Sequence, residues 1–151
     1  MVYILFLDSP IGRLKITSNA TAILSVEHEG DGEESKNPPE VLQRCRQQLQ
    51  QYFAGKRVMF DVPLQFEGTT FQRQVWQALQ QIPYGEVKSY KDVAIAIGNE
   101  KAVRAVGGAN NKNKLPILIP CHRVIGANGS LVGYALGLEH KQLLLELESR
   151  R

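Results

Sequence analysis

Hydrophobic and polar residues alternate in short runs at the start of the chain. Leu14 and Ile16 alternate with Arg13 and Lys15, which is typical of a strand with one buried and one solvated face. Similar runs on either side predict three short strands, over residues 2–7, 13–17 and 22–26. Only a few residues connect these runs, so we expect a small antiparallel sheet.

From residue 37 onward, apolar side chains recur every three or four positions, which is the period of a helix. This pattern predicts helices over residues 37–54, 69–82, 89–97, 100–110 and 138–149. We expect Asn37, Thr69 or Thr70, Ser89 and Asn99 to cap the first four of them. Residues 56–68 follow neither period and are interpreted as a linker between two parts of the molecule.

The helices predicted over residues 89–97 and 100–110 are separated by a tight turn at Gly98, which favours a helix-turn-helix. The second helix is unusual because five of its eleven residues are Ala or Gly, at Ala102, Ala105, Gly107, Gly108 and Ala109. Small residues let a helix approach either another helix or a DNA backbone closely, and the pattern leaves both open. Arg104 is the one long side chain near its middle.

An apolar run over residues 117–125 is interrupted by Pro120, Cys121, His122 and Arg123. Val and Ile on both sides predict a buried strand. Each polar side chain in such a strand needs a partner, and a proline marks a strand end or bulge. The run therefore predicts a core strand that stops at a cleft, with a functional site at the break.

The two cysteines differ in their surroundings. Cys45 lies on the apolar face of the helix predicted over residues 37–54, as a structural thiol does. Cys121 is followed by an imidazole and a guanidinium, and a neighbouring cation or base lowers the pKa of a thiol. A thiolate is a strong nucleophile, so we favour a reactive over a structural role for Cys121.

The composition is that of a globular protein, with 43% hydrophobic and 22% charged residues among 151. This length suffices for one core or two small ones. Two cysteines 76 positions apart form neither a disulfide framework nor a zinc pattern, so we expect a reducing, cytoplasmic location. The apolar segment at residues 1–7 is too short for a signal peptide or a membrane span.

Charge is distributed unevenly along the chain. Residues 1–68 carry seven Lys/Arg and nine Asp/Glu, whereas residues 69–151 carry eleven and six. Seven of those basic residues lie between Lys88 and Arg123, where only Asp92 and Glu100 oppose them. A solvated helix face gives the same pattern, but clustering around the candidate site favours a polyanionic partner.

Several motifs occur together in one order. They are Tyr84-Gly85-Glu86-Val87, Ser89-Tyr90, Arg104-Ala105-Val106-Gly107-Gly108-Ala109, Asn113, Pro120-Cys121-His122-Arg123-Val124 and Gly133-Tyr134, followed by a Leu-rich tail with Glu148. This order resembles the O6-alkylguanine-DNA alkyltransferases, which repair DNA by suicide alkyl transfer. The resemblance is dense over residues 70–148 and loose over the first 69.

The resemblance implies an α+β fold in two domains. Residues 1–68 would form a small antiparallel sheet with a helix, similar to ribonuclease H, and a linker. Residues 69–151 would form a mainly helical domain that contains the helix-turn-helix, binds DNA and accepts the alkyl group. It also implies irreversible transfer from O6-alkylguanine in duplex DNA, and from O4-alkylthymine, by a monomer without a cofactor or membrane partner.

The resemblance assigns roles to five residues at the reaction centre. Cys121 would attack the alkyl carbon, and His122 would receive the thiol proton through a water while Glu148 orients the imidazole. Tyr90 would help to rotate the nucleotide and donate to the leaving guanine, and Asn113 would hold the active-site turn. From the residues alone, Glu148 lies beside the apolar stripe of the last helix, where a carboxylate needs a partner, although a solvated helix end gives the same pattern.

Two further groups follow from the resemblance. Minor-groove DNA contacts would come from Ser89, Tyr90, Arg104, Ala105, Gly107, Gly108 and Arg123, with Arg104 filling the gap left by an extruded base. The base pocket would be formed by Val124, Tyr134, Ala135 and Leu136. Ala135 and Leu136 depart from a common Ser-Gly pair, and Lys114-Leu115 from Pro-Val. Residues 1–68 offer only Cys45 and His28 as soft metal ligands, so no structural zinc is expected.

Three other functions fit parts of the sequence. A cysteine hydrolase also uses Cys and His, but it needs an oxyanion hole and turnover. A helix-turn-helix DNA-binding protein without catalysis would use residues 89–110 and leave Cys121 idle. The non-catalytic alkyltransferase-like proteins lack the nucleophile, which this chain has at Cys121.

Overall fold

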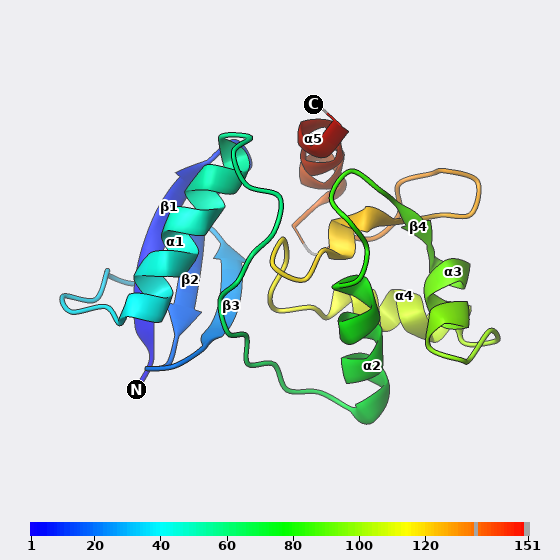
Figure 1. The fold of residues 1–151 in the computed structure, drawn as a ribbon, viewed down its shortest axis with the longest axis horizontal. Helices are drawn as coiled ribbons and strands as arrows, with labels where there is room; N and C mark the ends of the chain where they lie inside the picture. The colour runs from blue at the N-terminus through cyan, green and yellow to red at the C-terminus, as the bar shows by residue number, and fades with distance from the viewer. Residues whose placement is uncertain (135, 150–151) are drawn as a thin grey trace. The chain divides into compact units, whose positions relative to one another are not determined.

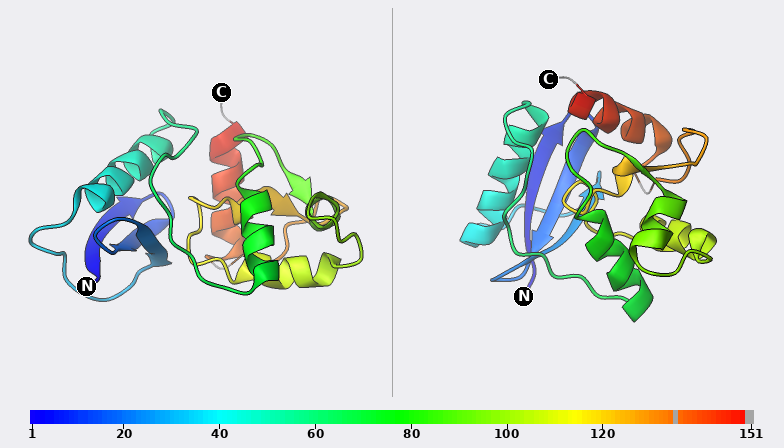
Figure 2. Two further views of the ribbon diagram at one scale, coloured as in Figure 1. Left: turned by 60° about the horizontal axis from the view of Figure 1, so that its bottom comes forward. Right: turned by 45° about the vertical axis from the view of Figure 1, so that its right-hand side comes forward.

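Three strands pair at the start of the chain, as the alternating pattern predicts. They are β1 (Tyr3–Ser9), β2 (Gly12–Ser18) and β3 (Ile23–His28), in an antiparallel sheet of order β1-β2-β3. Helix α1 (Glu40–Phe53) packs against this sheet (Figures 1 and 2). Gly12 has φ +102° in the tight β1–β2 turn, a conformation that glycine adopts without strain.

The structure is a computed structural model that describes residues 1–134 and 136–149. The chain divides into two compact units, Met1–Phe66 and Glu67–Arg151. The core of the first unit lies between the sheet and α1, where fully buried side chains include Leu14, Ile16, Leu42 and Leu49. Cys45 is also buried there, among apolar side chains.

The second unit is mainly helical. Its elements are α2 (Thr70–Leu79), β4 (Lys88–Ser89), α3 (Tyr90–Ala96), α4 (Val103–Asn111), the 3-10 turn η1 (Cys121–Arg123), β5 (Val124–Ile125) and α5 (Leu138–Ser149). Helices α2, α3 and α4 pack against one another (Figure 2). The turn η1 contacts both α2 and α5. The chain thus has an α+β fold. No helix in the described part of the chain is long and apolar enough to span a bilayer.

Two of the expected helix caps are confirmed. Thr69 and Ser89 each accept a hydrogen bond from the backbone of the third helical residue, and Gln72 and Asp92 complete the capping boxes. Asn99 is not a cap, because α4 begins only after Ala102 and its cap makes no side-chain bond. The first helix likewise begins later than predicted, after Pro39.

The strand predicted over residues 117–125 is wrong for most of its length. Ile117 has φ +74°, and the backbone N–H of Ile119 donates to the Leu115 carbonyl, so the segment turns before the cysteine. Only Val124 and Ile125 are extended, and they pair in parallel with Lys88 and Ser89. This pairing places the start of α3 beside the residues that follow Cys121.

Candidate active site

The segment carrying Cys121 is held by two asparagines from the end of α4 and the turn after it. Asn113 donates from Nδ2 to the Ile119 carbonyl (2.9 Å) and accepts from the Leu115 N–H (2.9 Å), which fixes the turn. Asn110 donates from Nδ2 to the Cys121 carbonyl (3.3 Å). These bonds, and not a sheet ladder, position the cysteine.

The Cys121 thiol is completely buried and unoxidised in this structure. Burial raises the pKa of the thiol to about 11, against the opposing effects of the Asn113 amide and the Lys141 ammonium. The expectation that neighbouring cations lower this pKa below its usual value is therefore wrong, since desolvation is the larger effect. At neutral pH the resting cysteine is a thiol, and its reaction requires a base.

A base lies next to it in the chain. His122 Nε2 lies 2.6 Å from Glu148 Oε2, and both side chains are buried. The carboxylate can only accept, so Nε2 carries the proton and Nδ1 presents a lone pair. Nδ1 is buried without a hydrogen-bond partner. Burial lowers the pKa of His122 against the opposing effect of the Glu148 carboxylate, and the nearby cations Arg123 and Lys141 lower it further, so the ring is neutral at pH 7.

Arg123 completes this cluster. Its Nε donates to Glu148 Oε1 (2.8 Å), one terminal nitrogen donates to Oε2 (3.0 Å), and the other donates to the Ile82 carbonyl (2.7 Å). The residue is only 6% exposed. This corrects the prediction that Arg123 contacts DNA, because its donors are turned inward to a buried carboxylate. Glu148 is not a solvated helix end.

Lys141 is a residue at this site that the sequence did not indicate. It is buried, and its Nζ donates to the carbonyls of Val124 (2.6 Å), Val132 (2.9 Å) and Gly133 (3.3 Å). Burial lowers the pKa of Lys141 to about 8. The signal in the sequence was its position three residues before Leu144 and seven before Glu148, on the same helical face.

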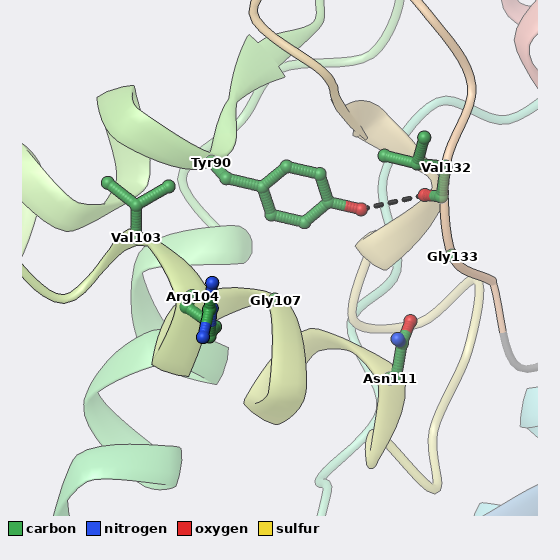
Figure 3. Close-up of a pocket in the computed structure, with 7 residues that line it drawn as sticks. All are labelled: Tyr90, Val103, Arg104, Gly107, Asn111, Val132 and Gly133. Atoms are coloured by element: carbon green, nitrogen blue, oxygen red, sulfur yellow. Dashed lines mark hydrogen bonds between the residues drawn. The ribbon is translucent and has the colours of Figure 1, made fainter.

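The segment that follows β5, residues 126–134, borders a pocket of about 490 Å³. The pocket is lined by Tyr90, Val103, Arg104, Gly107, Asn111, Val132 and Gly133 (Figure 3). Figure 3 shows Tyr90 reaching from α3 to the Val132 carbonyl, to which its hydroxyl donates at 2.8 Å. Burial raises the pKa of Tyr90, and negative charge on Cys121 would raise it further, so the phenol remains a donor at neutral pH.

The residues predicted to contact DNA, apart from Arg123, lie on α3 and α4 or, for Ser89, at the cap of α3. Arg104 is exposed and lines the pocket, and Gly107 lies one turn further along the same face. A Cβ added at Gly108 would meet nothing within 4 Å, so this side of α4 is open. Ala105 is also exposed, and Ser89 is half-buried as the cap of α3.

The predicted base-pocket residues are only partly described. Val124 is completely buried next to the cysteine turn, and Leu136 is half-buried. The Tyr134 hydroxyl is buried without a hydrogen-bond partner, and its ring stands edge-on to His122 with centroids 6.4 Å apart. Ala135 lies outside the described residues. Among residues 1–134 and 136–149, no group of three or more His, Cys, Asp or Glu could hold a metal ion.

Comparison with known protein families gives two adjacent matches. Residues 1–66 match the family described as "6-O-methylguanine DNA methyltransferase, ribonuclease-like domain". Residues 70–150 match the family described as "6-O-methylguanine DNA methyltransferase, DNA binding domain". Together the two matches span nearly the whole chain.

Individual relatives agree with these matches. The chain is 46% identical to the methylated-DNA–protein-cysteine methyltransferase of Methanosarcina acetivorans (98% of each chain covered). It is 48% identical to the constitutive enzyme of that name from Bacillus subtilis (98% and 96% covered). A crystal structure of Mycobacterium tuberculosis OGT in complex with DNA is similar at a TM-score of 0.87 and 43% identity, covering 95% of this chain and 91% of that one. The chain belongs to the methylated-DNA–protein-cysteine methyltransferase family.

Proposed function

We propose that this protein repairs duplex DNA by moving the alkyl group of O6-alkylguanine onto Sγ of its own Cys121. The observation that carries the proposal is the buried thiol beside a histidine whose Nε2 proton is fixed by Glu148 and whose Nδ1 is unpartnered. A base in that tautomer can accept the thiol proton through a bridging water. Cys121, His122 and Glu148 are thus the nucleophile, the base and the residue that orients the base.

The reaction is a displacement at a saturated carbon. The S–C bond forms, the C–O6 bond breaks, and its electron pair stays on guanine. The thiol proton, taken up by His122, ends on guanine: the Tyr90 hydroxyl donates to the leaving base and is reprotonated from the imidazolium through water. Asn113 holds the turn in which the sulfur lies. The thioether product has no route back, so each molecule reacts once and needs no cofactor.

DNA binding is assigned to α3 and α4. The exposed small residues of α4 allow the helix to enter the minor groove, where Arg104 takes the place of an extruded base. Extrusion costs a few kcal/mol and least for a damaged, weakly paired base. The base enters the pocket beside Tyr90 and lies near Val124, Tyr134, Ala135 and Leu136. The protein acts as a monomer in the cytoplasm, where its two free cysteines stay reduced.

The domain assignment belongs to the same proposal. Residues 1–68 form the ribonuclease-like domain and its linker, and residues 69–151 bind DNA and accept the alkyl group. The charge distribution supports this division, since the net positive charge is carried by residues 69–151.

The decisive experiment is mass spectrometry after incubation with a duplex that contains one O6-methylguanine. We expect one added methyl group on the peptide with Cys121 and none on the peptide with Cys45. Cys121→Ser should abolish transfer and keep DNA binding, because α4 and Arg104 are unchanged. Cys45→Ser is the matched control and should transfer normally. A methyl group on Cys45, or none at all, would overturn the proposal.

A further inference from the structure

Asn110 is a buried polar residue with half of its amide unused. It lies in α4 and is 1% exposed, and its Nδ2 donates to the Cys121 carbonyl at 3.3 Å. Its Oδ1 is buried without a partner. Rotating the amide would set two oxygens against each other, so the oxygen must remain the unpaired atom. Unpaired buried acceptors are costly and therefore rare in folded proteins.

Two other unpaired atoms lie at the same place. In the described part of the second unit, the buried side-chain atoms without a hydrogen-bond partner are Asn110 Oδ1, His122 Nδ1 and the Tyr134 hydroxyl. Asn110 is bonded to the Cys121 carbonyl, and His122 follows Cys121 in the chain. Negative charge on Cys121 contributes to the raised pKa of Tyr134. Three buried polar atoms near the nucleophile thus lack a hydrogen-bond partner, as in a site that binds a polar ligand.

The chemistry of the lesion identifies a donor for Asn110. With the alkyl group on O6 placed at Sγ, the base edge that carries N1 and the 2-amino group would face the Cys121 backbone, to whose carbonyl Asn110 is bonded. O6-alkylguanine has no proton on N1, so the 2-amino group is the only donor on this edge. O4-alkylthymine offers acceptors only on the corresponding edge. An acceptor such as Asn110 Oδ1 therefore complements the guanine lesion and not the thymine one.

We propose that Asn110 is a specificity-determining residue, whose Oδ1 accepts a hydrogen bond from the 2-amino group of the extruded O6-alkylguanine. The inference rests on the proposed alkyl transfer and adds a residue that selects the base. Its Nδ2 keeps the Cys121 carbonyl in place at the same time, so one amide links the position of the nucleophile to the identity of the base.

The test compares single-turnover transfer from duplexes that differ only in the lesion: O6-methylguanine, O6-methylhypoxanthine, which lacks the 2-amino group, and O4-methylthymine. The wild type should react faster with O6-methylguanine than with O6-methylhypoxanthine by at least about threefold to tenfold, the value of one hydrogen bond. It should also favour O6-methylguanine over O4-methylthymine. Equal rates on the two purines would overturn the inference without any variant.

Two variants locate the effect. Asn110→Leu is similar in size but has no acceptor, so its preference for the 2-amino lesion should fall to less than about twofold. Asn110→Asp keeps an acceptor oxygen, so it should retain the preference although the rates on both purines fall. If Asn110→Leu kept the wild-type preference for the 2-amino lesion, other groups would select the base, and the inference would be refuted. If the wild type transfers from neither purine, the proposed function itself has failed.

Discussion

Glu148 bonds to both His122 and Arg123, and this sets the protonation of His122. Arg123 donates twice to its carboxylate and provides the compensating positive charge. His122 can therefore remain neutral while it donates from Nε2. Burial lowers the pKa of His122 by more than the Glu148 carboxylate raises it, and the two nearby cations add to the lowering. The imidazole is thereby kept as a base with a free Nδ1 at the pH of the cell.

Glu148→Gln tests this arrangement. The change leaves the Arg123 guanidinium buried without its counter-charge, which typically costs about 3–5 kcal/mol. Alkyl transfer should slow about tenfold to a hundredfold, because the imidazole is no longer oriented by a carboxylate. Urea unfolding and single-turnover rates measure the two effects. Glu146→Gln, exposed on the same helix, is the control and should change neither. An unchanged transfer rate in Glu148→Gln across neutral pH would exclude the orienting role.

The lowered pKa of His122 also gives a pH dependence with a definite sign. In the unfolded chain the imidazole has its usual pKa of about 6.5, and in the folded protein the pKa is lower. Between these values the unfolded state binds more protons, so the free energy of unfolding should decrease as the pH falls below about 6.5. The transfer rate should be flat near neutral pH and fall only in acid. A rate that already falls between pH 8 and 7 would contradict a neutral resting histidine.

At the level of elements, α5 organises the site through one face. Its buried residues are Lys141, Leu144 and Glu148, so two of the three inward positions are charged. Glu148 holds the cysteine turn through His122 and Arg123, whereas Lys141 holds the β5–α5 loop through three carbonyls. A single helix therefore sets both the base and the loop beside the pocket.

Lys141→Met should release that loop. The Val132 carbonyl would keep its bond from Tyr90, but the Gly133 carbonyl would lose the bond from the Lys141 ammonium. We expect faster backbone hydrogen exchange over residues 126–134 and slower transfer, with Gln142→Met, exposed on the same helix, as the control. In the wild type, deprotonation of Lys141 above about pH 8 leaves fewer donors, so protection corrected for intrinsic exchange should also fall there. Unchanged protection in Lys141→Met would contradict the anchoring role.

Arg104 lies on α4, and a substitution tests its proposed role in filling the gap left by an extruded base. Arg104→Ala should weaken transfer from duplex DNA far more than reaction with free O6-benzylguanine, because only the duplex requires a base to leave its stack. Single-turnover rates on both substrates give the comparison. The exposed position of Arg104 means that the change should leave the free energy of unfolding nearly unaltered. Equal losses on the two substrates would contradict the intercalating role.

For the whole molecule, reaction should lower stability. Cys121 is completely buried, so a methyl group on its sulfur adds volume to a filled site, which typically costs about 1–3 kcal/mol. For a chain of this length, the melting temperature should fall by roughly 2–4 °C per kcal/mol. Thermal unfolding before and after reaction, with the DNA removed, measures the shift. Cys121→Ser treated in the same way should show none, and a higher melting temperature of the methylated protein would contradict the prediction.

Local patterns in the sequence were sufficient for much of this structure. The alternation of apolar and polar residues predicted the three strands of the first unit, and the capping residues Thr69 and Ser89 predicted where α2 and α3 begin. The motif around Cys121 and its upstream companions led to the family. These features depend on neighbours in the chain, through side-chain alternation, helical period and short-range hydrogen bonds, so they can be read without the fold.

The tertiary structure decided what depends on burial and on distant partners. The thiol has a raised pKa because the fold desolvates it, and Arg123 faces Glu148 because η1 packs against α5. The turn before Cys121 replaced the predicted strand because two asparagine side chains bond its carbonyls. Lys141 was not predicted, because a charged side chain is expected to be exposed. Its burial is favourable only because three carbonyls from other segments accept hydrogen bonds from it.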